Sequence, residues 1–409
     1  MPDAVKRETR PGPWLVAVAA TAALTCGLVV FAGALHLDIA HRALALVALP
    51  QLVVLALAAR IAHPALRRPA YAALALFLLE SAIGAIVSLE GGTASGVLHT
   101  GIAAFALAAC ALCLTACLRG APVPRAPWRD YVTLTKPRIM TLLLLTGACG
   151  MIIGHGGLPN GVLFVEAMFG LALACGGASA MNHLLDADID RQMKRTATRP
   201  VASGRVAPSR ALEFGLALSA ASFALLAVAV NPLAAVLALA GNLFYVIVYT
   251  RYLKRSTTQN IVIGGAAGAV PPLVGWAAAT GRLDLAAGLL FLIVFLWTPP
   301  HFWALALLIR KDYEDAGVPM LPVVRGARVA ANQILLYSLV LVAATLVPVG
   351  VSAWGLVYAI SAAALGAWFI WLAWRLRQDP SHARSATLFH FSLLYLALLF
   401  VAAAVSVSI

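Results

Sequence analysis

The strongest constraint on this chain is a series of apolar runs, each about 20 residues long. A helix of that length crosses roughly 30 Å of hydrocarbon, and lipid permits only helices or closed barrels to span it. Of the 409 residues, 62% are hydrophobic and 11% are charged. The pattern predicts an all-α polytopic membrane protein with thirteen spans, near residues 14–36, 43–62, 69–89, 97–118, 139–157, 161–181, 211–230, 232–250, 260–280, 284–308, 331–351, 353–374 and 387–408.

The net charge of +13 reflects membrane topology rather than nucleic-acid binding. With the N-terminus in the cytoplasm, only Arg42 and Arg282 among the basic residues fall on the opposite side, as the positive-inside rule requires. The acid-rich loops then face the cytoplasm too. The first span lacks a signal cleavage site and no transit peptide is evident, so we expect a multi-pass protein of the bacterial inner membrane.

The six cysteines all lie inside predicted spans. Cys110 and Cys113 form a CxxC pair, but together with Cys117 they occupy one face of an apolar helix. Small residues on such a face serve packing far more often than metal or disulfide chemistry. The sequence therefore predicts a packing role for these thiols.

A segment rich in Pro and Arg, residues 119–130, cannot continue a helix and predicts a cytoplasmic linker. It separates a four-span unit, residues 1–118, from a nine-span unit, residues 131–409. The nine-span unit opens with Lys136 and Arg138 on either side of Pro137, which is well placed to start a helix. We therefore expect a nine-helix bundle preceded by a four-helix membrane unit.

Asn182, Asp186 and Asp190 recur at intervals of four at the end of an apolar run. In a helix these positions share one face, so their oxygens converge where hydrocarbon meets water. Acids contribute little to membrane topology, which favours a functional role. The pattern predicts a site for a hard cation such as Mg²⁺.

Basic side chains accompany these acids in the cytoplasmic loops. For any single one, the positive-inside rule explains its presence equally well. As a group they would neutralise the oxygens of a diphosphate that carries Mg²⁺. They are Lys194, Arg195, Arg199, Lys254 and Arg255.

Three further acids leave alternatives open. Asp312 and Asp315 could hold a second Mg²⁺ or orient its waters, although Asp315 also fits a solvated loop position. Asp188 could be a metal ligand or the partner of Arg191.

The Asn-x3-Asp-x3-Asp pattern, followed by Met193 to Thr196 and by Arg199-Pro200, resembles the first motif of the intramembrane prenyltransferase superfamily. Five further blocks resemble its haem O synthase (protoheme IX farnesyltransferase) branch: residues 135–138, 259–268, 271–276, 298–303 and 312–322. The second acidic motif departs from the superfamily's usual Asp-x3-Asp, and only Asp312 matches the haem branch cleanly.

The resemblance implies a nine-helix fold and a reaction. Farnesyl diphosphate would donate its farnesyl group to a vinyl group of haem b, water would add, and haem O and diphosphate would form for terminal oxidases. It implies Asn182, Asp186, Asp190 and Asp312 as catalytic residues, with Mg²⁺ held by the three aspartates. The implied substrate-binding residues are Lys136, Arg138, Lys194, Arg195, Arg199, Lys254, Arg255, His301 and Tyr313.

His301 lies in the sequence Pro299 to Trp303, inside a predicted span. A titratable ring is costly there, so it is either a hydrogen-bonded core histidine or a ligand to haem iron. The paired prolines could widen a cavity beside it.

In the four-span unit, His41 and His99 open the second and fourth spans at similar depth, away from the cytoplasm. They are either interfacial polar residues or a clamp for a second haem. With Arg42 and the stretch 84–92 they resemble one half of haem A synthase. Because that enzyme has two such halves, we expect a haem-handling or assembly module, with haem A synthase or a terminal oxidase as partner.

Two other functions fit the sequence less well. A prenyltransferase for another aromatic acceptor, such as a quinone precursor, disagrees with the blocks at 299–303 and 312–322. A membrane transporter would place buried charges at midspan, whereas the acids here cluster at helix ends.

Overall fold

A computed structural model describes residues 126–350 and 354–408, together with short helical stretches between residues 18 and 78. Most of the expected four-helix unit, including His41, His99 and the CxxC cysteines, lies outside the described residues. The linker is described only from Ala126 onward.

In the described part, 9 helices are long and apolar enough to cross a membrane. Each overlaps one of the spans predicted from residue 131 onward, so the nine-helix bundle is confirmed. The spans are Pro137–His155, Gly161–Leu185, Pro208–Val230, Pro232–Ser256, Asn260–Thr280, Leu285–Leu308, Ala327–Gly350, Leu356–Gln378 and His382–Ser408.

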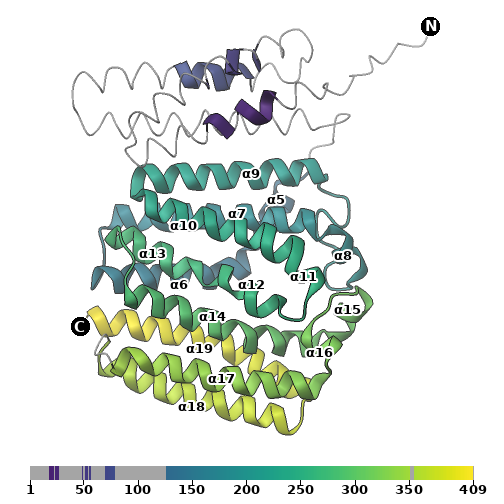
Figure 1. Cartoon of the computed structure of the whole chain (residues 1–409), viewed down its shortest axis with the longest axis vertical. Coiled ribbons are helices and arrows are strands. Elements are labelled where there is room, and N and C mark those ends of the chain that lie inside the picture. The colour runs from purple at the N-terminus through teal and green to yellow at the C-terminus, as the bar shows by residue number, and fades with distance from the viewer. Residues whose placement is uncertain are drawn as a thin grey trace.

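Six spans are single helices, which run side by side in Figure 1. They are α6 (Pro137–His155), α7 (Gly161–Leu185), α14 (Leu285–Leu308), α17 (Ala327–Gly350), α18 (Leu356–Gln378) and α19 (His382–Ser408).

The other three spans change their helix geometry part-way. They are α9 (Pro208–Leu225) with the π-helical η2 (Leu226–Val230); α10 (Pro232–Leu243) with the π-helical η3 (Phe244–Leu253) and α11 (Lys254–Ser256); and α12 (Asn260–Gly268) with α13 (Val270–Thr280). Four short helices connect spans or precede them: α5 (Trp128–Leu134), α8 (Ala187–Gln192), α15 (Arg310–Asp315) and α16 (Leu321–Val324).

Local sequence signals set the ends of these helices. Pro137 takes the first position of α6, where its missing N–H costs nothing. The side chains of Asn160 and Asp284 accept hydrogen bonds from the first turns of α7 and α14. Gly281 adopts a left-handed conformation at φ 68° and ends α13.

Glycines bring α6 and α13 into close backbone contact. A Cβ atom on Gly275 would lie 2.8 Å from the carbonyl carbon of Gly147, and one on Gly150 would lie 2.9 Å from Cα of Pro272. Small residues of this kind let membrane helices pack without intervening side chains. The contact fixes α6, whose first turn follows Lys136.

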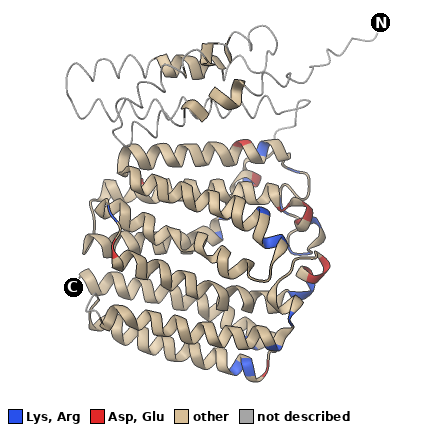
Figure 2. Ribbon diagram, in the orientation of Figure 1, with Lys and Arg blue, Asp and Glu red and all other residues tan. Residues whose placement is uncertain are grey.

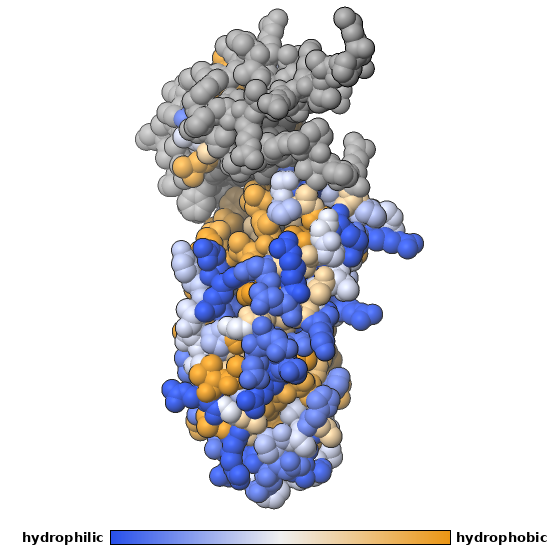
Figure 3. Space-filling view, turned by 90° about the vertical axis from the view of Figure 1, so that its right-hand side faces the viewer, coloured by the Kyte–Doolittle hydropathy of each residue, from blue (hydrophilic) through white to orange (hydrophobic). Residues whose placement is uncertain are grey.

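Charged side chains gather at one end of the bundle, the end that carries α8, α11 and α15 (Figures 1 and 2). Viewed from that side, the surface is dominated by hydrophilic residues (Figure 3). The acids and bases singled out from the sequence therefore share one face of the molecule.

Candidate active site

The Asn182/Asp186/Asp190 motif lies at a break between two helices. We expected one continuous helix, and this is wrong: α7 ends at Leu185, Asp186 has φ −93° and ψ 1°, and α8 follows. Helix-like backbone hydrogen bonds between residues four apart continue across the break. Asp186 N–H donates to Asn182 O at 2.9 Å, and Asp190 N–H donates to Asp186 O at 2.8 Å. The three side chains are therefore brought together, each at most 3% exposed.

A chain of short contacts links Asp186 to three other helices. Lys254 Nζ, from α11, donates to Asp186 Oδ2 at 2.6 Å, and Asn182 Nδ2 donates to the same oxygen at 2.8 Å. Lys136 Nζ, just before α6, donates to Asn182 Oδ1 at 2.6 Å. Thr250 Oγ1, from η3, accepts from Asn182 Nδ2 at 3.1 Å. Two cations thus flank one carboxylate and one amide.

The two motif carboxylates differ in how fully they are engaged. Both oxygens of Asp190 accept hydrogen bonds from Arg199 Nη1 at 2.8 Å. Asp186 Oδ1, in contrast, is buried and has no hydrogen-bond partner. A buried anionic oxygen without a donor is costly, so this atom is available to a cation.

Lys136 is held in a strained conformation. It has φ 52° and ψ 60°, the left-handed region that a residue before proline strongly avoids. Such strain costs roughly 1–3 kcal/mol and is typical of functional sites. Burial and the nearby charge of Arg199 lower the pKa of Lys136 to about 7. Its charge is therefore unusually responsive to an anion placed beside it.

Asp188 pairs with Arg255, so the alternative pairing with Arg191 is wrong. The guanidinium of Arg255 donates to both Asp188 oxygens at 2.6 and 2.7 Å, and to Leu185 O at 2.7 Å. The hydrogen bond from Arg255 lowers the pKa of Asp188 to about 2. Arg191 Nε instead donates to Ala202 O. Arg255, expected to bind phosphate, is engaged in holding the end of α7.

The other predicted phosphate ligands are exposed. Arg138, Lys194 and Arg195 lie at the surface, and the structure shows no ion-pair partner for them within residues 126–350 and 354–408. Tyr313, in α15, is 7% exposed. Burial raises the pKa of Tyr313 while Arg195 opposes the shift, which indicates that α15 lies near the motif.

A model of the UbiA prenyltransferase family matches residues 143–402. The chain belongs to the UbiA prenyltransferase family. A relative from Gloeobacter violaceus named protoheme IX farnesyltransferase is 53% identical over 287 residues, covering 69% of this chain and 93% of the relative.

A second relative of the same name, from Roseiflexus sp., is 44% identical over 401 residues, covering 90% of this chain and 75% of the relative. The match therefore continues into the N-terminal part of this UbiA-family chain. Among solved structures, a UbiA homologue from Archaeoglobus fulgidus bound to GPP and Mg²⁺ aligns with a TM-score of 0.51 at 18% identity, covering 67% of this chain and 99% of that one. This likeness supports the fold.

Asp312 and Asp315, expected to hold a second metal ion, both belong to α15 in this UbiA-family protein. Asp312 is half-buried in α15, Asp315 is exposed, and neither makes a side-chain hydrogen bond within the described residues. The same part of the chain contains no group of three His, Cys, Asp or Glu side chains that could hold a metal ion. A role for Asp312 stays a prediction.

His301 is buried among aromatic side chains in α14. Its Nδ1 is 2.7 Å from Ser392 Oγ, and its ring stacks on Trp297 at 4.3 Å and on Phe389 at 4.8 Å. The helix α14 continues through Pro299 and Pro300. These contacts orient the ring through Nδ1, and Nε2 has no hydrogen-bond partner within the described residues. An axial iron ligand binds through a ring nitrogen rather than a ring face, so both alternatives for this residue stay predictions.

Sequence reasoning missed two residues beside the motif. Thr250 is fully buried and bonded to Asn182, and His183 is buried with neither ring nitrogen partnered. Thr250 could have been found, because it stands four residues before Lys254 and so shares its helix face. His183 carries no such signal, since a histidine at a helix end is common.

Proposed function

We propose that this UbiA-family protein transfers the farnesyl group of farnesyl diphosphate to a vinyl group of haem b, forming haem O and diphosphate. The observation that carries the proposal is the buried Asp186, with one unpartnered oxygen, set between Lys136, Lys254 and Arg199. The choice of acceptor is supported by the names of the relatives and by the haem-branch blocks.

Mg²⁺ fits the donor set. Mg²⁺ is usually held by one or two carboxylates together with substrate phosphates and water, so a protein cage of three acids is not required. Asp186 Oδ1 is the free ligand, Asp190 is a second carboxylate one turn away, and Asn182 orients Asp186. The Archaeoglobus structure bound to GPP and Mg²⁺ supports this choice. When bound, Mg²⁺ would stabilise the negative charge that grows on the departing diphosphate.

The basic residues would bind the diphosphate and hold its charge. Lys136 bonds to Asn182, Lys254 bonds to Asp186, and Arg199 is fixed against Asp190. Exposed Lys194 and Arg195 are free to close on the outer oxygens. As the C–O bond breaks, its electron pair leaves with diphosphate, and these preorganised charges stabilise the products of ionisation.

Two steps follow ionisation: the farnesyl group bonds to haem b, and water adds. The vinyl carbon of haem b attacks the allylic cation at C1 of the farnesyl chain, and water adds to the new cation at the haem side with release of a proton. The allylic cation must be protected from bulk water until it reacts, which a site at the boundary of a membrane bundle provides. The porphyrin and the farnesyl tail both partition into that boundary.

We propose a membrane orientation and a role for the N-terminal residues as well. The charged end would face the cytoplasm of a bacterial inner membrane, which agrees with the positive-inside rule. Residues 1–118 would form a separate four-helix module that binds a second haem through His41 and His99 and meets haem A synthase or a terminal oxidase during assembly.

An acceptor competition tests the function. Purified protein in detergent would receive farnesyl diphosphate, Mg²⁺ and equal amounts of haem b and a quinone precursor, and both products would be quantified by mass. We expect farnesylated haem alone. Farnesylation of the quinone precursor with haem untouched would overturn the choice of acceptor while leaving the prenyltransferase assignment intact.

A further inference from the structure

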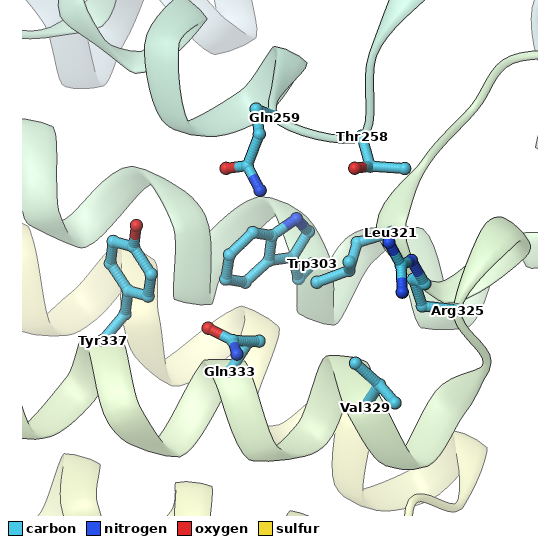
Figure 4. A pocket seen from close by; sticks show the side chains of 8 residues that line it. All are labelled: Thr258, Gln259, Trp303, Leu321, Arg325, Val329, Gln333 and Tyr337. Atoms are coloured by element: carbon cyan, nitrogen blue, oxygen red, sulfur yellow. The ribbon is translucent and has the colours of Figure 1, made fainter.

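A polar groove of about 240 Å³ lies outside the acid motif, between the start of α12, α14 and the face of α17 whose Tyr337 contacts Trp303 (Figure 4). Pockets for whole drug-sized ligands measure roughly 300–1,000 Å³, so this groove suits one arm of a larger molecule. Its polar lining consists of Thr258, Gln259, Trp303, Arg325, Gln333 and Tyr337.

The lining contains one buried hydrogen-bond donor without a partner and several donors open to solvent. Trp303 is 2% exposed, and its Nε1 is buried without a hydrogen-bond acceptor. The side chains of Gln259, Gln333 and Arg325 make no hydrogen bond within the described part of the chain. Figure 4 shows Gln259 directed toward the Trp303 ring, Gln333 on the other side of that ring, and Arg325 at one end. Gln259 and Arg325 are exposed and can bond water, but native proteins rarely leave a buried donor such as Trp303 Nε1 unsatisfied. That atom points to an acceptor in the groove.

The position of the groove indicates an amphiphilic ligand. Val329, Gln333 and Tyr337 recur every four residues along α17, so the groove follows about 12 Å of that helix from its charged end into the span. Polar groups inside the hydrocarbon are costly without partners. A ligand here would present an anion to Arg325 at the surface while its body lay in the membrane.

The groove is bounded by the same two segments that border the acid motif. Gln259 follows Lys254 and Arg255 by a few residues, and Leu321 and Arg325 follow α15, which carries Tyr313. A molecule whose anionic arm lies in the groove therefore contacts the loops that hold the diphosphate site.

We propose that this groove binds a carboxylate of a membrane-partitioned tetrapyrrole, namely a propionate arm of the haem acceptor. The proposal rests on the function proposed above. Arg325 forms a charge-assisted pair with the carboxylate, and Trp303 Nε1, Gln259 and Gln333 donate to its remaining lone pairs. In this arrangement the groove orients the acceptor and takes no part in the bond changes.

Binding without turnover provides the test. Zinc protoporphyrin and its dimethyl ester would be titrated by fluorescence against the full chain in nanodiscs, with Arg325→Gln and with Arg328→Gln as the matched control. Arg328 carries the same charge one turn away, is exposed and does not line the groove. We expect the wild-type protein and Arg328→Gln to prefer the free acid about tenfold or more, and Arg325→Gln to bind both forms alike. Full discrimination by Arg325→Gln would overturn the proposal.

Turnover kinetics and native mass spectrometry distinguish a haem propionate from a lipid headgroup in the groove. In turnover, Arg325→Gln should raise KM for haem b about tenfold and leave KM for farnesyl diphosphate unchanged. If the groove instead holds a lipid headgroup, Arg325→Gln will lose bound phosphatidylglycerol in native mass spectrometry without changing the ester discrimination, and the proposal is wrong. A third outcome is also informative: the wild-type protein prefers the free acid, Arg325→Gln does not, and yet no haem O is formed in turnover. That result would overturn the proposed function and leave the groove proposal standing.

Discussion

Asp186 and Asp188 stand two residues apart but have opposite surroundings. Asp186 is 1% exposed and keeps one oxygen unpartnered, whereas Asp188 lies at the surface in a bidentate pair with Arg255. Only the first can present a carboxylate to a cation and a diphosphate together. We therefore propose Asp186 as the residue that serves chemistry, whereas Asp188 is paired with the arginine that bonds the last carbonyl of α7.

We expect Asp186→Asn to lower kcat/KM by roughly 10²–10³-fold, the scale of a lost electrostatic stabiliser. Asp188→Asn should change kcat/KM by less than about tenfold, because an exposed ion pair contributes only about 0–1 kcal/mol. Steady-state assays of both purified variants check this. Equal losses in the two variants would show that the motif acts through structure.

The lowered pKa of Lys136 gives a pH prediction. As pH rises through about 7, Lys136 loses its proton and the site loses a positive charge that favours diphosphate. Since kcat/KM reports groups in the free enzyme, kcat/KM for farnesyl diphosphate should fall above that pH. In Lys136→Arg the guanidinium stays charged, so the fall should disappear. A persistent fall in Lys136→Arg would assign the titration to another group.

Residue positions were predictable where they depend on local spacing. The four-residue interval placed Asn182, Asp186 and Asp190 together, even though the helix breaks at Asp186. The pairing of Asp188 with Arg255 was not predictable, because the partners are 67 residues apart in sequence. The surroundings of His301 depend likewise on Ser392 and Phe389, which α19 supplies.

At the scale of helices, hydropathy predicted the nine described spans and missed their internal breaks. The π-helical η3 is an example: Thr250 Oγ1 donates to Tyr245 O five residues earlier, and the same Oγ1 accepts from Asn182. Such segments often occur at functional sites. Their geometry follows from contacts between helices, which a hydropathy profile does not contain.

The close packing of α6 on α13 gives a stability prediction. In Gly275→Ala the new methyl group would overlap the backbone of Gly147, and backbone atoms cannot move aside as side chains do. We expect a loss of roughly 1–3 kcal/mol or more, seen as a lower melting temperature in detergent. Gly288→Ala is the control, because a Cβ there meets nothing within 4 Å. Equal melting temperatures would contradict the packing account.

At the scale of the whole molecule, every residue proposed for farnesyl transfer lies in residues 131–409. The Gloeobacter relative matches over 93% of its length with 69% of this chain. We expect a protein lacking residues 1–118 to keep farnesyl transfer and to lose any low-spin haem spectrum due to His41 and His99. A folded truncation without transferase activity would contradict the division into units.

The central claim concerns one product. The full-length protein would be incubated in detergent with haem b, farnesyl diphosphate and Mg²⁺, and the extracted pigment analysed by mass spectrometry alongside a diphosphate assay. The account predicts a pigment heavier than haem b by one farnesyl group and one hydroxyl, formed in equal amount to released diphosphate. Diphosphate release with unchanged haem b, or no release at all, would contradict it.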